Sequence, residues 1–63
     1  MDFTRNLKQA RHKIGISQKE LAGRIGVAQG TIGNWETGTR EPKLSQLEDI
    51  ARALKTTLAE LIK

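Results

Sequence analysis

The chain has 63 residues, a formal net charge of +4 at pH 7, no cysteine and one histidine. This length predicts one domain, residues 1–63, with a single core, and the composition offers neither disulfides nor a Cys/His cluster for a metal. No apolar run approaches the roughly 20 residues that span a bilayer, and the N-terminus lacks the apolar segment of a signal peptide, so we expect a soluble cytoplasmic domain without metal, cofactor or membrane partner.

The first predicted helix runs from about Phe3 to Lys13. Asp2 stands where an N-cap belongs, and Gly15 provides an exit from the helix. The apolar residues of this segment recur at helical spacing and are Phe3, Leu7, Ala10 and Ile14.

The second predicted helix begins with a complete start signal. Ser17 can accept the backbone N–H of Glu20 while the Glu20 carboxylate reaches back to the Ser17 N–H, which is a capping box. Ile16 and Leu21 are spaced for a hydrophobic staple across this cap. Gly26 should end the helix, because glycine readily takes the left-handed conformation that lets the chain leave and turn.

A third helix is predicted over 29–37, after a turn that includes Val27 and Ala28. Ile32 and Trp35 lie three residues apart on one face, and Gly38 offers a second glycine stop. A polar loop over 39–43 follows.

The fourth predicted helix starts at or after Lys43, because Pro42 disfavours helix at the residue before it. Its cap is either Lys43 or Ser45, and Ser45 with Glu48 has the spacing of a capping box. The helix should run to about Lys55. Its amphipathic stripe consists of Leu44, Leu47, Ile50, Ala51 and Leu54.

A short fifth helix is predicted after Thr57, which with Glu60 has the spacing of a third capping box. Its Leu58, Leu61 and Ile62 are expected to face inward. No segment alternates apolar and polar residues as a strand does. The sequence therefore predicts an all-α fold, a compact bundle of five short helices.

The positive charge is concentrated in the first two thirds of the chain. Residues 1–43 hold eight Lys/Arg against four Asp/Glu, whereas residues 44–63 hold three of each. Such a surface attracts polyanions, although a merely solvated face of a small protein is often basic as well.

The residues that invite a catalytic interpretation have simpler explanations. His12 has no partner fixed by spacing and is expected to be a solvated surface residue. Glu20 is explained by its cap, so no isolated carboxylate pair remains for acid/base chemistry. No glycine follows a strand as in a phosphate-binding loop. We therefore expect no enzymatic activity and no catalytic residue.

The outward side of the third helix carries the residue types that read bases. If Ile32 and Trp35 face the core, the residues left outside are Gln29, Gly30, Thr31, Gly33 and Asn34. Gln and Asn can bond bidentately to adenine in the major groove, and a Thr methyl suits the thymine methyl. Each of the two glycines costs roughly 1 kcal/mol relative to alanine in a helix. They either allow close approach to the groove or to a neighbouring helix, or merely weaken the helix.

The segment SQKELAGRIGVAQGTIGNWETG resembles the helix-turn-helix of the phage repressor and Cro family, also called the XRE family. A small Ala22 suits the point where the two helices cross, and Gly26 suits the turn. The specific elements are Gln18, Leu21-Ala22, Gly26, Gln29, Ile32 and the ending Trp35-Glu36-Thr37-Gly38. Glu41-Pro42 and the spacing of the fourth helix extend the resemblance over nearly the whole chain, and imply a lambda-repressor-like fold.

The resemblance also implies roles for individual residues. Gln18 would contact a phosphate and brace Gln29, and Arg11 would form a partly buried ion pair with Glu36 that is either purely structural or presents the guanidinium to the DNA backbone. Ala28 and Gly30 depart from the polar residues common in the family. The implied base-reading set is Gln29, Gly30, Thr31 and Asn34. The implied phosphate-binding set is Gln18, Lys19, Arg11, Thr39, Arg40 and Lys43.

In function, the resemblance implies a transcriptional regulator that binds double-stranded DNA through the major groove. It would act in the cytoplasm on the nucleoid as a repressor of phage or prophage type. It would bind a palindromic operator as a homodimer through the fifth helix or the loop before the fourth, and could be a monomer when free. The alternative is an antitoxin or adaptor-type interaction module, with Leu58, Leu61 and Ile62 exposed to a partner.

Overall fold

The computed structural model describes residues 2–63, and Met1 of the predicted domain lies outside them. The helices are α1 (Phe3–Ile14), α2 (Gln18–Ile25), α3 (Gln29–Thr37), α4 (Leu44–Ala53) and α5 (Leu58–Ile62). This confirms the predicted all-α bundle of five short helices, and residues 2–63 contain no strand. None of these helices is both long and apolar enough to cross a membrane.

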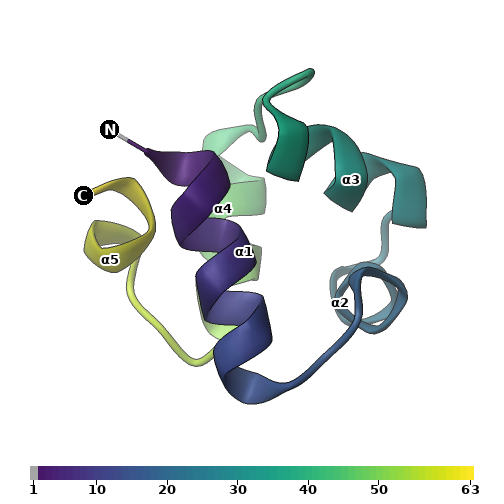
Figure 1. Ribbon diagram of the computed structural model, residues 1–63, viewed down its shortest axis with the longest axis horizontal. Coiled ribbons are helices and arrows are strands. Elements are labelled where there is room, and N and C mark those ends of the chain that lie inside the picture. The colour runs from purple at the N-terminus through teal and green to yellow at the C-terminus, as the bar shows by residue number, and fades with distance from the viewer. Residues whose placement is uncertain (1) are drawn as a thin grey trace.

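The helices are arranged around α1, with the α2–α3 pair on one side of it and α5 on the other (Figure 1). α1 contacts α3 and α5, α2 contacts α3 and α4, and α4 contacts α5. The side chain of Asn6 closes the fold at the termini, because its Nδ2 donates to the backbone oxygens of Leu61 at 3.0 Å and Lys63 at 3.2 Å. The start of α1 and the end of α5 therefore lie side by side in Figure 1.

The local signals at the start of α2 are confirmed. Ser17 Oγ accepts from the Glu20 N–H at 3.0 Å, and Glu20 Oε1 accepts from the Ser17 N–H at 3.4 Å. The glycines that follow α1, α2 and α3 all have positive φ angles of 75–81°, so they end the helices as expected. Asp2 also caps α1, although its Oδ1 lies 3.5 Å from the Arg5 nitrogen.

Helix α4 begins after Lys43, so the alternative with Ser45 as the cap is wrong. Gln46 Oε1 accepts from the Lys43 N–H at 2.8 Å. It is the side-chain acceptor for the N-cap N–H, the role that Glu48 would have had toward Ser45. The helix ends at Ala53, two residues before the expected Lys55. Lys55 itself takes the left-handed conformation, with φ of 55°, and the Thr56 N–H donates to the Ala51 oxygen at 2.9 Å. The chain turns there in the way that glycine usually permits.

The predicted capping box of α5 forms only in part. Thr57 Oγ1 accepts from the Glu60 N–H at 3.1 Å, but the Glu60 carboxylate pairs with Lys63 Nζ at 2.7 Å instead of reaching back to Thr57. The hydrogen bond from Lys63 lowers the pKa of this exposed carboxyl group. The prediction was wrong in its second half because a lysine one turn later competes for the same carboxylate.

The core is aliphatic apart from Phe3 and Trp35, and α5 contributes only Leu61 to it. Two residues expected to face inward do not, because Leu44 is 64% exposed and Ile62 is 37% exposed, while Leu58 is half-buried. Leu44 is the first residue of α4 and α5 has only five residues, so no neighbouring helix covers these positions. The buried core consists of Phe3, Leu7, Ile16, Leu21, Ala22, Ile32, Trp35, Ile50, Ala51, Leu54 and Leu61.

The two serines near helix starts allow a test of these boundaries. Ser17→Ala removes an N-cap bond and should lower the free energy of unfolding by about 1 kcal/mol. Ser45→Ala removes a hydroxyl that caps nothing and should change it by less than about 0.5 kcal/mol. Urea unfolding followed by the fluorescence of Trp35 measures both, and equal losses would contradict the observed start of α4.

Candidate nucleic-acid interface

Helices α2 and α3 pack against each other across the short turn 26–28. Leu21 and Ala22 from α2 are buried with Ile32 and Trp35 from α3, and none of these four is more than 3% exposed. The Val27 N–H donates to the Ala22 oxygen at 3.0 Å, which fixes the turn to the end of α2. The angle between the two helices is therefore set by buried apolar contacts and by the turn.

The opposite side of α3 faces solvent. Gln29, Gly30 and Asn34 are exposed, whereas Thr31 is half-buried. Ala28 occupies the N-cap position and makes no side-chain cap bond, so the first N–H groups of α3 lack the partner that Ser17 gives to α2. The predicted base-reading residues thus lie together on one accessible helix face.

No neighbouring helix requires the two glycines of α3. A Cβ added at Gly30 would meet nothing within 4 Å, and one added at Gly33 would lie 3.9 Å from Gln18 Oε1, an ordinary contact. Close helix packing is therefore excluded as their explanation. Approach to a groove and simple weakening of the helix remain.

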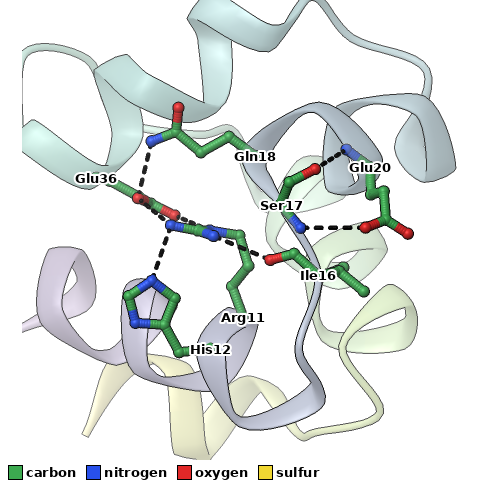
Figure 2. A network of polar contacts seen from close by, with 7 residues as sticks. All are labelled: Arg11, His12, Ile16, Ser17, Gln18, Glu20 and Glu36. Carbon is green, nitrogen blue, oxygen red and sulfur yellow. Dashed lines mark hydrogen bonds and ion pairs between the residues drawn. The ribbon is translucent and has the colours of Figure 1, made fainter.

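The inner side of α3 is tied to α1 by a buried ion pair. Arg11 Nε and Nη2 lie 2.6 Å and 3.0 Å from the two carboxylate oxygens of Glu36, so the pair is bidentate. Arg11 Nη1 also donates to the Ile16 oxygen at 2.9 Å. Figure 2 shows the guanidinium enclosed among these groups and the exposed His12, whose Nε2 lies 3.3 Å from Arg11 Nη2. The expected partly buried ion pair is therefore present.

Gln18 joins α2 to the same carboxylate. Its Nε2 donates to Glu36 Oε1 at 3.0 Å, as Figure 2 shows. A carboxylate can only accept, so the amide nitrogen must face Glu36 and the amide oxygen must face away. The structure thus uses Gln18 to brace Glu36, whereas the resemblance implied that it braces Gln29.

The charges of this network stabilise each other. Burial alone would raise the pKa of Glu36, but the hydrogen bonds from Arg11 and Gln18, with the charges of Arg11 and Lys8, lower it overall. The hydrogen bond to Glu36 raises the pKa of Arg11 further above its ordinary value. Both groups are therefore charged at neutral pH, and their buried polar atoms are satisfied.

The predicted phosphate-binding residues divide into two groups. Lys19, Thr39, Arg40 and Lys43 are exposed at the start of α2 and in the loop after α3. That loop is anchored to α3, because the Arg40 N–H donates to the Asn34 oxygen at 3.2 Å. Arg11 and Gln18, by contrast, already bond inside the protein, and Arg11 is only 8% exposed.

Two residues beside these sets were not singled out from the sequence. Gln46 lines a hollow with Thr31, Asn34 and Arg40, next to the predicted reading face. Lys8, on α1, lines a different hollow, together with Glu36 of α3. For Lys8 the signal was available, because it stands three residues before Arg11 and so shares its helix face.

The network makes a prediction about acid stability. The folded-state pKa of Glu36 lies below the ordinary value of 4.5, so the unfolded chain takes up the proton first as pH falls. The stability that ionised Glu36 provides is complete above its unfolded pKa and disappears as the pH falls through its folded pKa. Glu36→Gln should therefore be less stable than wild type at pH 7, and the difference should shrink between about pH 5 and pH 3.

Urea unfolding at a series of pH values measures this difference. Glu48→Gln, which removes an exposed carboxylate outside the network, serves as the control and should differ little from wild type at any pH. A Glu36→Gln deficit that stays constant down to about pH 3 would contradict the assigned direction of the pKa shift.

Comparisons with known proteins agree with this geometry. A family model described as helix-turn-helix matches residues 7–61. The chain is 47% identical over 52 residues to the uncharacterized HTH-type transcriptional regulator y4dL of Sinorhizobium fredii, covering 82% of this chain and 26% of that protein. It is 33% identical over 60 residues to the cryptic phage CTXphi transcriptional repressor RstR of Vibrio cholerae, covering 95% and 54%. The chain thus spans between a quarter and about half of these relatives.

The fold also matches a solved structure. The restriction-modification controller protein C.AhdI of Aeromonas hydrophila aligns with a TM-score of 0.90 and 32% sequence identity, covering 95% of this chain and 87% of that one. The sequence match, the shared fold and the packed α2–α3 pair lead to the same assignment. The chain belongs to the helix-turn-helix family of transcriptional regulators of the phage repressor and Cro (XRE) type.

Proposed function

We propose that this chain binds double-stranded DNA as a transcriptional regulator of the repressor kind, with α3 in the major groove. The observation that carries the proposal is the two-sided character of α3. Its inner side is fixed by Ile32, Trp35 and the buried Glu36, whereas its outer side leaves Gln29 and Asn34 free in solvent. A rigidly held helix with exposed amide side chains is suited to read base edges.

The base-reading set in this proposal is Gln29, Gly30, Thr31 and Asn34. The two amide side chains can each pair with adenine, and the threonine methyl can contact thymine. Gly30 adds no side chain, and the open space around it lets the backbone of α3 approach the groove. This gives a reason for a glycine that no contact within the protein explains.

The DNA-backbone contacts proposed around this helix come from the start of α2 and from the loop after α3. Lys19 flanks α3 from α2, and Thr39, Arg40 and Lys43 flank it from the anchored loop. Helix α4 begins directly after Lys43, so the positive end of its dipole adds to the attraction for phosphate. Gln18 retains a second amide hydrogen, with which it can reach a phosphate while it still holds Glu36.

Dimerisation on DNA belongs to the same proposal. Leu44 at the start of α4 and Ile62 at the end of α5 are the large apolar side chains that residues 2–63 leave exposed. Ile62 lies on α5, which is one expected dimer contact, and Leu44 directly follows the loop before α4, which is the other. Such a dimer would place two α3 helices about one helical turn apart on a palindromic operator. Repression would follow from exclusion of polymerase from the promoter. An antitoxin or adaptor module would instead present α5 to a different protein. Of the residues expected to be exposed for that use, Ile62 is exposed and Leu58 is half-buried, but Leu61 is buried at 1% exposure.

Salt dependence and one amide substitution test the binding mode. Affinity for a duplex selected from random DNA should fall steeply between 50 and 200 mM salt, because phosphate contacts release counterions. Gln29→Ala should lose about 1–3 kcal/mol of preference for the selected sequence but keep non-specific binding. Fluorescence anisotropy measures both, with Gln9→Ala, on an exposed site of α1, as the control. Salt-independent affinity would refute DNA binding and favour the interaction module, and an unchanged preference would refute readout by Gln29.

Substitution of Leu44 tests the dimer. Leu44→Gln should leave the fold and binding to a single half-site unchanged, because this side chain is 64% exposed. On the full palindrome it should abolish cooperative binding, whereas Leu44→Met, which keeps an apolar side chain, should retain it. Binding isotherms on half-site and palindromic duplexes make the comparison. Equal cooperativity in all three proteins would exclude Leu44 from the dimer contact.

A further inference from the structure

The inward orientation of Arg11 leaves α1 without its expected contact to DNA. Nε and Nη2 of this side chain bond to Glu36, Nη1 bonds to the Ile16 oxygen, and the side chain is only 10% exposed. A phosphate at this position would have to compete with a bidentate carboxylate that is already in place. Any contact from α1 to the DNA backbone must therefore come from another residue.

Lys8 lies on the same side of α1, three residues before Arg11, and is exposed. It lines a hollow whose other walls are Asp2, Thr4, Arg5 and Glu36. The ammonium is close enough to Glu36 for its charge to help lower the pKa of that carboxyl group. Lys8 thus stands at the mouth of the cleft in which the buried ion pair lies.

Among the charged residues lining this hollow, Lys8 carries a positive charge that no ion pair of the described residues neutralises. Glu36 is neutralised by Arg11 at 2.6 Å, and Asp2 is paired with Arg5 at 3.2 Å. Among residues 2–63, the ion pairs within 4 Å include none formed by Lys8. The hollow therefore presents one positive charge that no carboxylate of the described chain balances at close range.

The hollow opens beside the end of α3. Thr4 Cγ2 lies 3.6 Å from the place that a Cβ on Gly38 would occupy, so the start of α1 packs against the exit of α3. The loop with Thr39 and Arg40 begins at this point. Lys8 therefore places a positive charge from α1 beside the end of α3, close to where the loop with Arg40 begins.

We propose that Lys8 is a DNA backbone contact, whose ammonium binds a phosphate beside the groove occupied by α3 and provides from α1 the contact that Arg11 cannot make. This inference rests on the proposed DNA binding by α3. It assigns Arg11 a positioning role and Lys8 the role of phosphate ligand. Lys8 reads no base, so it contributes affinity and no sequence preference.

The salt dependence of binding distinguishes Lys8 from a matched lysine. Lys8→Gln should make the negative slope of log affinity against log salt shallower by about 0.9 and weaken binding roughly 5- to 10-fold at 0.1 M salt. Lys13→Gln removes the same charge from the same helix, about 140° away around its axis, on the side that faces α5. It should leave the slope unchanged. Anisotropy titrations of the selected duplex at five salt concentrations measure both, with preference over a scrambled duplex retained.

Thermal unfolding and Lys8→Arg separate a phosphate contact from a structural role, since Lys8 also stands near the negative end of α3. We expect Lys8→Gln to melt like wild type and Lys8→Arg to keep the full slope. If Lys8→Gln has the wild-type slope, or lowers the melting temperature without changing the slope, the inference is wrong while DNA binding stands. If wild-type affinity itself shows no salt dependence, the proposed function fails first.

Discussion

The buried ion pair between Arg11 and Glu36 fixes α3 against α1. Three nitrogens of one guanidinium connect α1 to the carboxylate on α3 and to the oxygen of Ile16, and Gln18 attaches α2 to the same carboxylate. Removal of one partner from a buried pair typically costs 3–5 kcal/mol, because the other charge stays buried without compensation. One polar cluster thus fixes three helices of the 63-residue chain.

This attachment explains how α3 can be a poor helix by its own sequence. It contains two glycines, has nine residues and follows an N-cap residue, Ala28, that makes no side-chain cap bond. Its position comes from Ile32, Trp35 and Glu36 on the inner side, so its outer residues need not favour helix formation. In the proposed complex, stability and recognition are therefore assigned to opposite sides of the same helix, and the reading residues are free to match DNA.

Features encoded within a few neighbouring residues could be predicted from the sequence, and those that depend on distant neighbours could not. The cap at Ser17 and the exit at Gly26 involve residues within one turn, and both were confirmed. The exposure of Leu44 depends on how far the other helices extend. The spacing of apolar residues along α4 does not contain that information. Gln18 reaches a carboxylate 18 positions later only because α2 and α3 pack together. The resemblance provided the Arg11–Glu36 pair, and the structure showed that the guanidinium points inward.

The orientation of α3 against α1 depends on the ion pair, and a double substitution tests this dependence most directly. Arg11→Met with Glu36→Leu fills the same space with apolar atoms and should stay folded, because such replacements are often neutral or stabilising. It lacks the directional bonds to Ile16 and Gln18, so affinity for the selected duplex should fall at least tenfold, or about 1.4 kcal/mol. A folded double variant that binds DNA with wild-type affinity would show that the ion pair does not orient α3.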